Sequence, residues 1–126
     1  MIGYVTVGTN DITRAAAFYD ALFAEVAMPR SMASETFVAW ASAPDKPSFG
    51  VTKPFNGQPA TVGNGVMVAL AAANPEQVKQ LYAKAMALGA SDEGKPGFRG
   101  DSGYYAAYFR DLDGNKLNFF CFVAPS

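Results

Sequence analysis

The chain has 126 residues, of which half are apolar and 17% are charged, so the composition suits a compact fold with a real core and argues against disorder. Ten basic and eleven acidic residues give a net charge of −1 with no basic stripe, so we expect neither nucleic-acid binding nor attachment to an anionic membrane. No apolar run approaches the ~20 residues that span a bilayer, and the N-terminal segment lacks the basic region of a signal peptide.

The histidine and cysteine counts narrow the chemistry further. The chain contains no histidine, which excludes Ser-His-Asp and Cys-His catalysis and removes the commonest ligand of zinc, iron and nickel. An all-oxygen site for magnesium or manganese stays open. Cys121 is the only cysteine, so an internal disulfide is excluded and a reducing, cytoplasmic location is predicted.

The first half of the chain begins with a strand and a helix. MIGYVTVG, residues 1–8, alternates apolar and small or polar side chains in the manner of a strand. The period then changes to that of a helix, which we expect over about residues 11–24, with Asp11 among the residues that can cap it. Segments that favour strands follow around SETFVAWAS and PSFGVTKP, and the turn-forming APDK separates them.

The second half repeats this order after a connector. Residues 55–64 are rich in Gly, Pro and Asn, and VMVALAA then predicts a strand. A helix is expected over about residues 75–89, because Asn74 can cap its start and Gly89 can end it. ASDEGKPGFRGDSG is turn-rich with room for a short strand. YYAAYFR and KLNFFCFV predict a closing hairpin with its turn at Leu112–Asn115.

The two halves share one pattern at a fixed offset. Asp11 and Asn74 precede the two helices, and Tyr4 and Met67 hold matching places on the first strands, in each case 63 residues apart (74 − 11 and 67 − 4). We therefore predict an α+β fold of two βαβββ units that form curled mixed sheets within a single domain. The alternative is one α+β sandwich with chance symmetry. The predicted units span residues 1–54 and 65–126.

Two motifs connect this pattern with a known family. VGTNDITRAAAFYDALFA after the first strand and FRDLDGNKLNFF at the end resemble the vicinal oxygen chelate superfamily, which comprises glyoxalases, bleomycin-resistance proteins and extradiol dioxygenases. The resemblance is greatest to the bacterial glyoxalase-like branch. It implies helices on the convex faces of the sheets, a cleft formed by the two units and, as is usual in the family, a homodimer.

The resemblance also indicates where a metal would be held. Metal-dependent members direct histidine or glutamate into the cleft from the first and last strands of each unit, and these places fall at Tyr4, Gly50, Met67 and Asn118. None of these residues is an ordinary ligand of zinc, nickel or iron. We therefore expect no metal and no other cofactor at this site, and a metal-dependent dioxygenase is not predicted.

The same positions suggest a binding site for a small organic ligand, aromatic or amphiphilic. Asn118 shares a strand face with Phe120 and Phe122. If Tyr104 and Tyr108 lie on that face, the cleft is aromatic. The predicted ligand-binding residues are Tyr4, Met67, Tyr104, Tyr108 and Asn118. The alternatives are that Asn118 is a structural amide, satisfied by a neighbouring strand or by Tyr4, and that each tyrosine only packs in the core or at its rim.

Six other side chains have simpler interpretations. Asp111 and Asp113 are predicted to form the hairpin turn, and Cys121 to face a helix as a buried apolar residue. Trp40 is either a core residue or a stacking wall. Arg110 is either the cation of the cleft or a solvated or ion-paired surface residue, and Asp101 is a candidate acid or base in a loop.

Three functions stay open on this evidence. The first is a ligand-binding or sequestering protein that lacks the usual metal ligands. The second is a glyoxalase-like lyase or isomerase of the lactoylglutathione-lyase type, acting with a noncanonical metal or with none. The third is a small dimeric protein whose cleft is filled by its own aromatic side chains.

Overall fold

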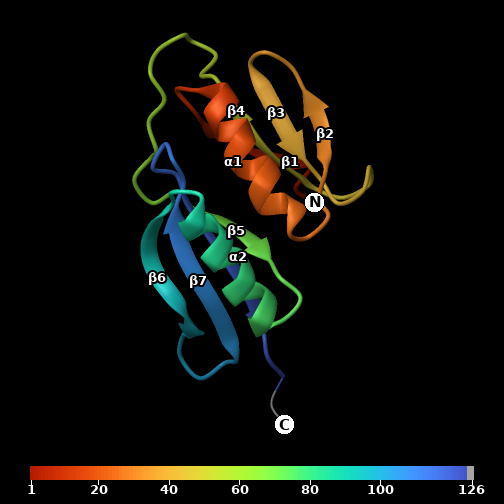
Figure 1. The fold of residues 1–126 in the computed structure, drawn as a ribbon, viewed down its shortest axis with the longest axis vertical. Coiled ribbons are helices and arrows are strands. Elements are labelled where there is room, and N and C mark those ends of the chain that lie inside the picture. Colours follow the sequence, from red (N-terminus) through yellow and green to blue (C-terminus); the bar gives the residue numbers. More distant parts are fainter. Residues whose placement is uncertain (125–126) are drawn as a thin grey trace. The chain divides into compact units, whose positions relative to one another are not determined.

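The computed structural model describes residues 1–124, and their contacts divide the chain into two compact units, Met1–Gly63 and Asn64–Ser126 (Figure 1). Each unit contains one strand, one helix and three further strands in that order, so the predicted pair of βαβββ units is confirmed. Each helix lies against the sheet of its own unit. That the two units act as a single domain stays a prediction.

The first unit contains a four-stranded mixed sheet in the order β1-β4-β3-β2. Strand β1 runs parallel to β4, and the other neighbours are antiparallel. The elements are β1 (Tyr4–Gly8), α1 (Ile12–Ala24), β2 (Arg30–Ala33), β3 (Phe37–Trp40) and β4 (Ser48–Thr52).

The second unit repeats this topology in the order β5-β8-β7-β6, again with the first and last strands parallel. Its elements are β5 (Val68–Ala71), α2 (Pro75–Ala87), β6 (Ser91–Phe98), β7 (Tyr104–Arg110) and β8 (Lys116–Phe122). Strand β6 occupies eight residues, so it is longer than the short strand that the sequence suggested. Met67 lies directly before β5.

The predicted caps explain where the helices begin. The Asp11 side chain accepts a hydrogen bond from the Arg14 backbone N–H at 3.0 Å, which satisfies one of the free donors of the first turn of α1. Asn74 does the same for Gln77 at 2.9 Å in α2, where Pro75 occupies the first turn. The observed helix bounds therefore agree with those predicted to within two residues.

Aromatic side chains form the core of the first unit between α1 and its sheet. Tyr19 and Phe23 of α1 pack on Trp40 and Phe49, with ring centroids 4.8–5.8 Å apart. The Trp40 side chain is buried, and its Nε1 donates a hydrogen bond to Asp20 Oδ1 at 2.9 Å. Trp40 is therefore a core residue rather than a stacking wall.

The core of the second unit lies between α2 and the helix-facing side of β7 and β8. Phe109 and Phe119 stack there with centroids 5.5 Å apart, and Leu117 is fully buried beside them on the same face. Cys121 is buried on this face as predicted, and its burial raises the pKa of the thiol. The candidate site lies on the opposite face of this sheet.

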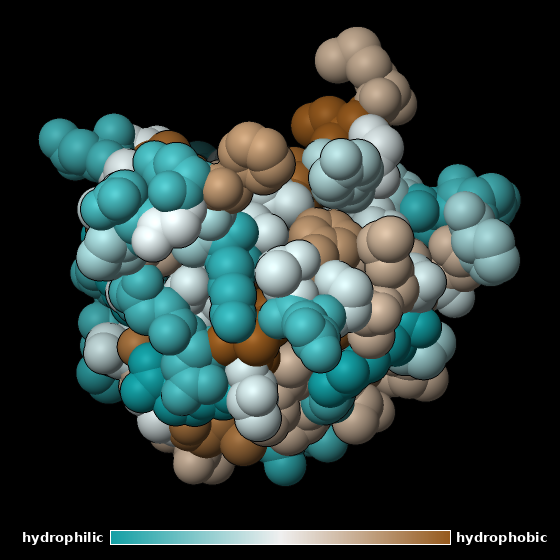
Figure 2. All heavy atoms as spheres, turned by 90° about the horizontal axis from the view of Figure 1, so that it is seen from above, coloured by the Kyte–Doolittle hydropathy of each residue, from teal (hydrophilic) through white to brown (hydrophobic). Residues whose placement is uncertain are grey.

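Within residues 1–124, none of the helices has the length and apolar character needed to cross a bilayer. The face drawn in Figure 2 interleaves hydrophilic and hydrophobic side chains instead of gathering either kind into one continuous area.

Candidate functional site

The hairpin between β7 and β8 is fixed by Asp111. Its Oδ1 atom accepts hydrogen bonds from the backbone N–H groups of Asp113 and Asn115, both at 2.9 Å, and its Oδ2 atom accepts from Asn115 Nδ2 at 3.1 Å. Gly114 adopts a φ of 91°, which glycine tolerates best. Asp111 is thus a turn-former, as predicted, and the turn sets the register that pairs Tyr108 with Asn118.

Asn118 lies in the middle of β8, with neighbours β5 and β7 on either side. Its side chain is 0% exposed, and its Nδ2 atom donates a hydrogen bond to Tyr104 Oη at 2.7 Å. Its Oδ1 atom is the one buried side-chain polar atom without a hydrogen-bond partner among the described residues. The amide is therefore only half satisfied, at a cost of about 1–3 kcal/mol for the unpaired atom.

Tyr104 and Tyr108 lie on the Asn118 face of the sheet, since Tyr108 is the cross-strand partner of Asn118 and Tyr104 is four residues before it. Burial raises the pKa of Tyr104, a hydrogen bond with Tyr108 raises it further, and the bond from Asn118 lowers it. The phenol of Tyr104 is thus held in its neutral form. The three polar side chains form one connected group on this face.

Two cations lie beside Tyr108. The Arg99 guanidinium carbon and the Lys116 Nζ atom are 5.4 and 5.5 Å from the centre of its ring, within the range of a cation–π contact. Arg99 is held in place because its guanidinium also donates to the carbonyl oxygens of Lys95 and Gly97. Sequence reasoning missed both cations, although Lys116 could have been found because it is two residues from Asn118 on the same strand.

The Arg110 side chain forms an ion pair. Its guanidinium pairs with Glu93 at 2.5 Å and donates to the Gly114 carbonyl at 3.0 Å, and this ion pair lowers the pKa of Glu93. The ion-paired alternative for Arg110 is therefore confirmed. Asp101 is exposed in the loop between β6 and β7.

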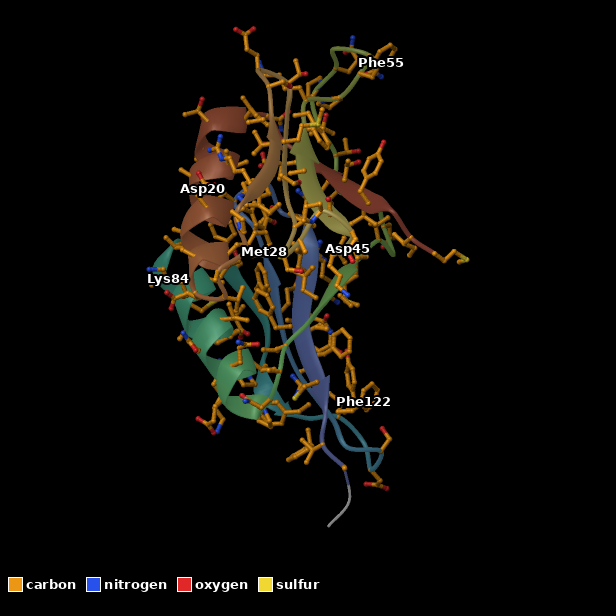
Figure 3. All side chains as sticks on the ribbon, turned by 90° about the vertical axis from the view of Figure 1, so that its right-hand side faces the viewer. Asp20, Met28, Asp45, Phe55, Lys84 and Phe122 are labelled. Carbon is orange, nitrogen blue, oxygen red and sulfur yellow. The ribbon has the colours of Figure 1, made fainter. Side chains whose placement is uncertain are left out.

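Aromatic rings extend the face beyond the amide. Tyr104 stacks on Phe120 with centroids 5.7 Å apart and contacts Phe122 at 5.3 Å. Phe122 is 66% exposed, and Figure 3 shows it on the side of the sheet away from α2. This part of the second unit therefore combines flat apolar surface with a few polar groups, as binding sites for small molecules do.

The other two predicted ligand-binding residues lie apart from this group in the sequence and in their elements. Tyr4 is in the first unit, where it is 65% exposed and makes an edge contact with Phe37 at 6.3 Å. Met67 is 39% exposed before β5. Ligand binding by Tyr4 and Met67 stays a prediction.

The strand registers test whether the residues present could hold a metal. Thr6 pairs with Gly50 across β1 and β4, and Ala69 pairs with Asn118 across β5 and β8, so Gly50 and Asn118 hold equivalent places in the two units. Gly50 has no side chain to offer, and Phe37 ring carbons lie 2.9 Å from where a Cβ would be. Residues 1–124 contain no group of three or more His, Cys, Asp or Glu side chains that could hold a metal. This donor set does not fit the metal of the resemblance.

The two βαβββ units and the hairpin motif between β7 and β8 are those of the glyoxalase fold. It belongs to the Glyoxalase/Bleomycin resistance protein/Dioxygenase superfamily, whose sequence profile matches residues 1–119.

Solved structures of the same kind are similar along nearly the whole chain. A glyoxalase/bleomycin resistance protein from Albidiferax ferrireducens is 40% identical with a TM-score of 0.85, covering 95% of this chain and 97% of that one. A family enzyme from Burkholderia phytofirmans (22% identical, TM-score 0.76, coverage 96% and 98%) and a lactoylglutathione lyase from Agrobacterium tumefaciens (21%, 0.71, 95% and 92%) share the fold. No curated protein matches the chain.

Proposed function

We propose that this chain is a small-molecule-binding protein of the superfamily that acts without the usual metal ligands. The observation that supports it best is the buried amide of Asn118, which stands where the resemblance places a metal-binding acid and bonds to Tyr104 instead. Its partners are phenols and aromatic rings, which suit an organic ligand better than a metal ion.

The amide offers an acceptor to such a ligand. Asn118 Oδ1 has no partner in the protein, so an O–H or N–H group of the ligand would satisfy it. Because the atom is covered, the ligand reaches it only after neighbouring side chains move. The rings of Phe120 and Phe122 then provide apolar surface, and we assign Met67 and Tyr108 of the same unit to the remaining contacts. Ligand binding by Tyr4 in the first unit belongs to the same proposal.

Replacing Asn118 with leucine tests this assignment. A ligand that donates to Oδ1 should bind about 10–100-fold more weakly to Asn118→Leu, which corresponds to roughly 1–3 kcal/mol for the lost hydrogen bond. Folding should be nearly unaffected, because a half-satisfied buried amide is exchanged for an apolar side chain of similar volume. A thermal-shift screen of small aromatic compounds identifies the ligand, and calorimetry measures both effects.

Two outcomes would count against Asn118 as a ligand-binding residue. Unfolding of Asn118→Leu would make the residue a structural amide. Unchanged affinity in a folded Asn118→Leu protein would place the ligand elsewhere. Tyr104→Phe provides a matched control, because it removes the internal bond to the amide without removing the amide.

A glyoxalase-like lyase is the second candidate. The neutral hydroxyl of Tyr104, bonded to Tyr108 and Asn118, favours it because a neutral phenol can donate a hydrogen bond to an oxygen that gains negative charge in the reaction. The lactoylglutathione lyase among the similar structures is too distant in sequence to carry its activity to this chain. Turnover of a hemithioacetal that is lost in Tyr104→Phe would support the lyase over the binding protein.

Metal content separates the proposal from a metal-dependent enzyme. Protein purified without added metal should contain zinc, nickel and iron well below one equivalent, since a thioether, a phenol and an amide gain too little from these ions to replace their water. Elemental analysis is the measurement. One equivalent of any of these metals that disappears in Asn118→Leu would contradict the proposal.

A homodimer belongs to the same proposal, since members of this superfamily often form dimers. Sedimentation at micromolar concentration should show a species of twice the 13.3 kDa chain mass. A 13.3 kDa species alone would contradict it. The cytoplasmic location stays a prediction from the single cysteine.

A further inference from the structure

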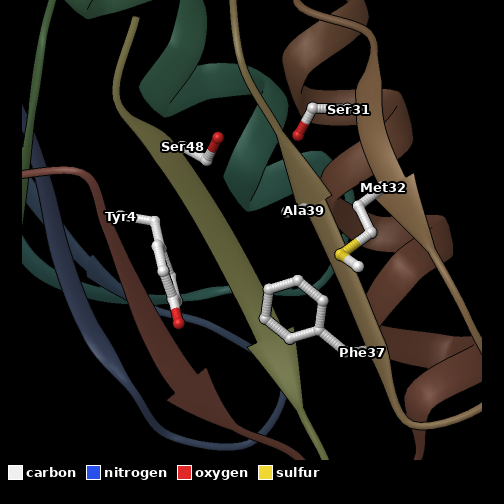
Figure 4. A pocket seen from close by; sticks show the side chains of 6 residues that line it. All are labelled: Tyr4, Ser31, Met32, Phe37, Ala39 and Ser48. Carbon is white, nitrogen blue, oxygen red and sulfur yellow. The ribbon is translucent and has the colours of Figure 1, made fainter. Parts of the chain in front are cut away.

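The first unit has a hollow at one end of its sheet, where β1 and β4 end and the chain leaves toward the second unit. Its volume is about 400 Å³, which is in the usual range for ligand pockets. It shares no lining residue with the face of the first sheet that Figure 4 shows around Tyr4. The lining includes Asn10, Lys53, Pro54, Phe55, Gln58 and Pro59.

The loop that forms most of this lining is fixed at both ends. Directly after β4, the Lys53 backbone N–H donates to the Thr36 carbonyl oxygen at 2.8 Å. At the other end, the Ala60 backbone N–H donates to Asn10 Oδ1 at 2.7 Å, which ties the loop to the turn between β1 and α1. The hollow between these two anchors is therefore part of the folded unit and exists before any ligand arrives.

Phe55 lies on a tight turn of this loop. The Gly57 N–H donates to the Pro54 carbonyl oxygen at 3.1 Å, and Gly57 has a φ of 74°, which glycine adopts at little cost. The Phe55 ring is fully exposed, and Figure 3 shows it standing out from the loop. An exposed ring on a fixed turn gains from being covered without first having to be ordered. The rings of Pro54 and Pro59 add to the apolar part of the lining.

The polar part of the lining carries one positive charge. Lys53 is the only charged residue that lines the hollow, and within residues 1–124 its ammonium group has no ion pair. The exposed side-chain amide of Gln58 likewise makes no hydrogen bond within that part of the chain. Two carboxylates are next to lining residues in the sequence, Asp11 and Glu35, but neither lines the hollow. The hollow therefore offers an ammonium group and an amide to a negatively charged ligand.

One ammonium group beside an apolar surface suits an organic carboxylate. The Lys53 ammonium is a point charge that balances one negative charge, and the Gln58 amide nitrogen supplies a further donor. A phosphate group carries more negative charge than one lysine balances. We propose that this hollow binds a flat aromatic carboxylate, with the carboxylate at Lys53 and Gln58 and the ring against Phe55. The inference goes beyond the function proposed above, because Asn118 and the other residues of that site take no part.

The test compares benzoate with benzamide, two flat probes of nearly the same shape that differ in charge. The full chain is titrated at pH 7 and low salt, and the backbone amide NMR signals of Gly57 and Gln58 report binding in the loop. Benzoate should bind about fivefold more tightly, a modest factor because the ammonium group is exposed. Lys53→Gln should abolish this preference by weakening the binding of benzoate alone. Phe55→Ala should weaken the binding of both probes by a similar factor, about threefold or more.

Lys46→Gln is the matched control. Lys46 is an exposed lysine that precedes β4, whereas Lys53 follows it, so the two lie at opposite ends of that strand. All three variants change exposed side chains and should fold, and Lys46→Gln should leave the binding of both probes unchanged.

Three results would overturn the proposal. They are equal affinity for the two probes, loop signals that do not move, and an equal loss of benzoate binding in Lys46→Gln and Lys53→Gln. Benzoate that moves only the amide signals of β8 would lie at the Asn118 site and would also overturn it. The Asn118→Leu test above does not depend on the loop signals, so the two proposals can fail separately.

Discussion

Replacing Asp111 with alanine should lower the free energy of unfolding by about 3 kcal/mol. The carboxylate is buried in the β7–β8 turn and accepts three hydrogen bonds, two from the backbone N–H groups of Asp113 and Asn115 and one from the Asn115 side chain. Hydrogen bonds to a charged group contribute about 1.5–3 kcal/mol each when measured singly, and water replaces part of that in a turn. Urea unfolding at pH 7 measures the loss.

Two further variants show whether the hydrogen bonds are the cause. Asp111→Asn keeps an acceptor for both backbone donors and loses only the contact with the Asn115 amide, so its cost should be about 1 kcal/mol. Asp101→Ala removes an exposed aspartate from another loop and should change stability by less than about 0.5 kcal/mol. A loss below 1 kcal/mol in Asp111→Ala would show that the turn forms without its carboxylate.

The helices and their caps could be predicted because their signals are local. Asp11 and Asn74 precede apolar residues at helical spacing, and both caps occur in the structure. Strand β2 was not located from the sequence, since all four of its residues are exposed and show no alternation. Strand β6 contains Pro96 and two glycines, which disfavour strands. Both are edge strands, where polar and irregular sequences limit unwanted pairing.

For the candidate site, the sequence could predict only on which face of the sheet each side chain lies, from the alternation of side chains along the strands. Alternation placed Tyr104 and Tyr108 on the Asn118 face, and the register confirms this. It could not show that the amide bonds to Tyr104 diagonally, since that depends on side-chain rotamers. The approach of Arg99 to Tyr108 depends on the shape of a loop, which leaves no periodic signal in the sequence.

Introducing a carboxylate at position 118 should have the other large effect. Asn118→Asp keeps the size of the side chain but places an ionisable group where the native one is 0% exposed. Burial disfavours the charged form, so the pKa of the new carboxyl group should rise from about 3.9 to roughly 6 in the folded state. A rise of two units corresponds to about 3 kcal/mol of lost stability at pH 7, relative to Asn118→Leu.

The pH dependence distinguishes this cause from poor packing. The folded-state pKa is raised, so the penalty is fully present above it and fades as the pH falls toward the unfolded-state value. The difference in unfolding free energy between Asn118→Asp and Asn118→Leu should therefore shrink between pH 7 and about pH 4.5. The groups that face the new carboxylate are the hydroxyl of Tyr104 and, around Tyr108, the cations Arg99 and Lys116. These cations oppose the rise, so a difference near zero at pH 7 would mean that they neutralise the site, and a large difference independent of pH would mean that packing is responsible.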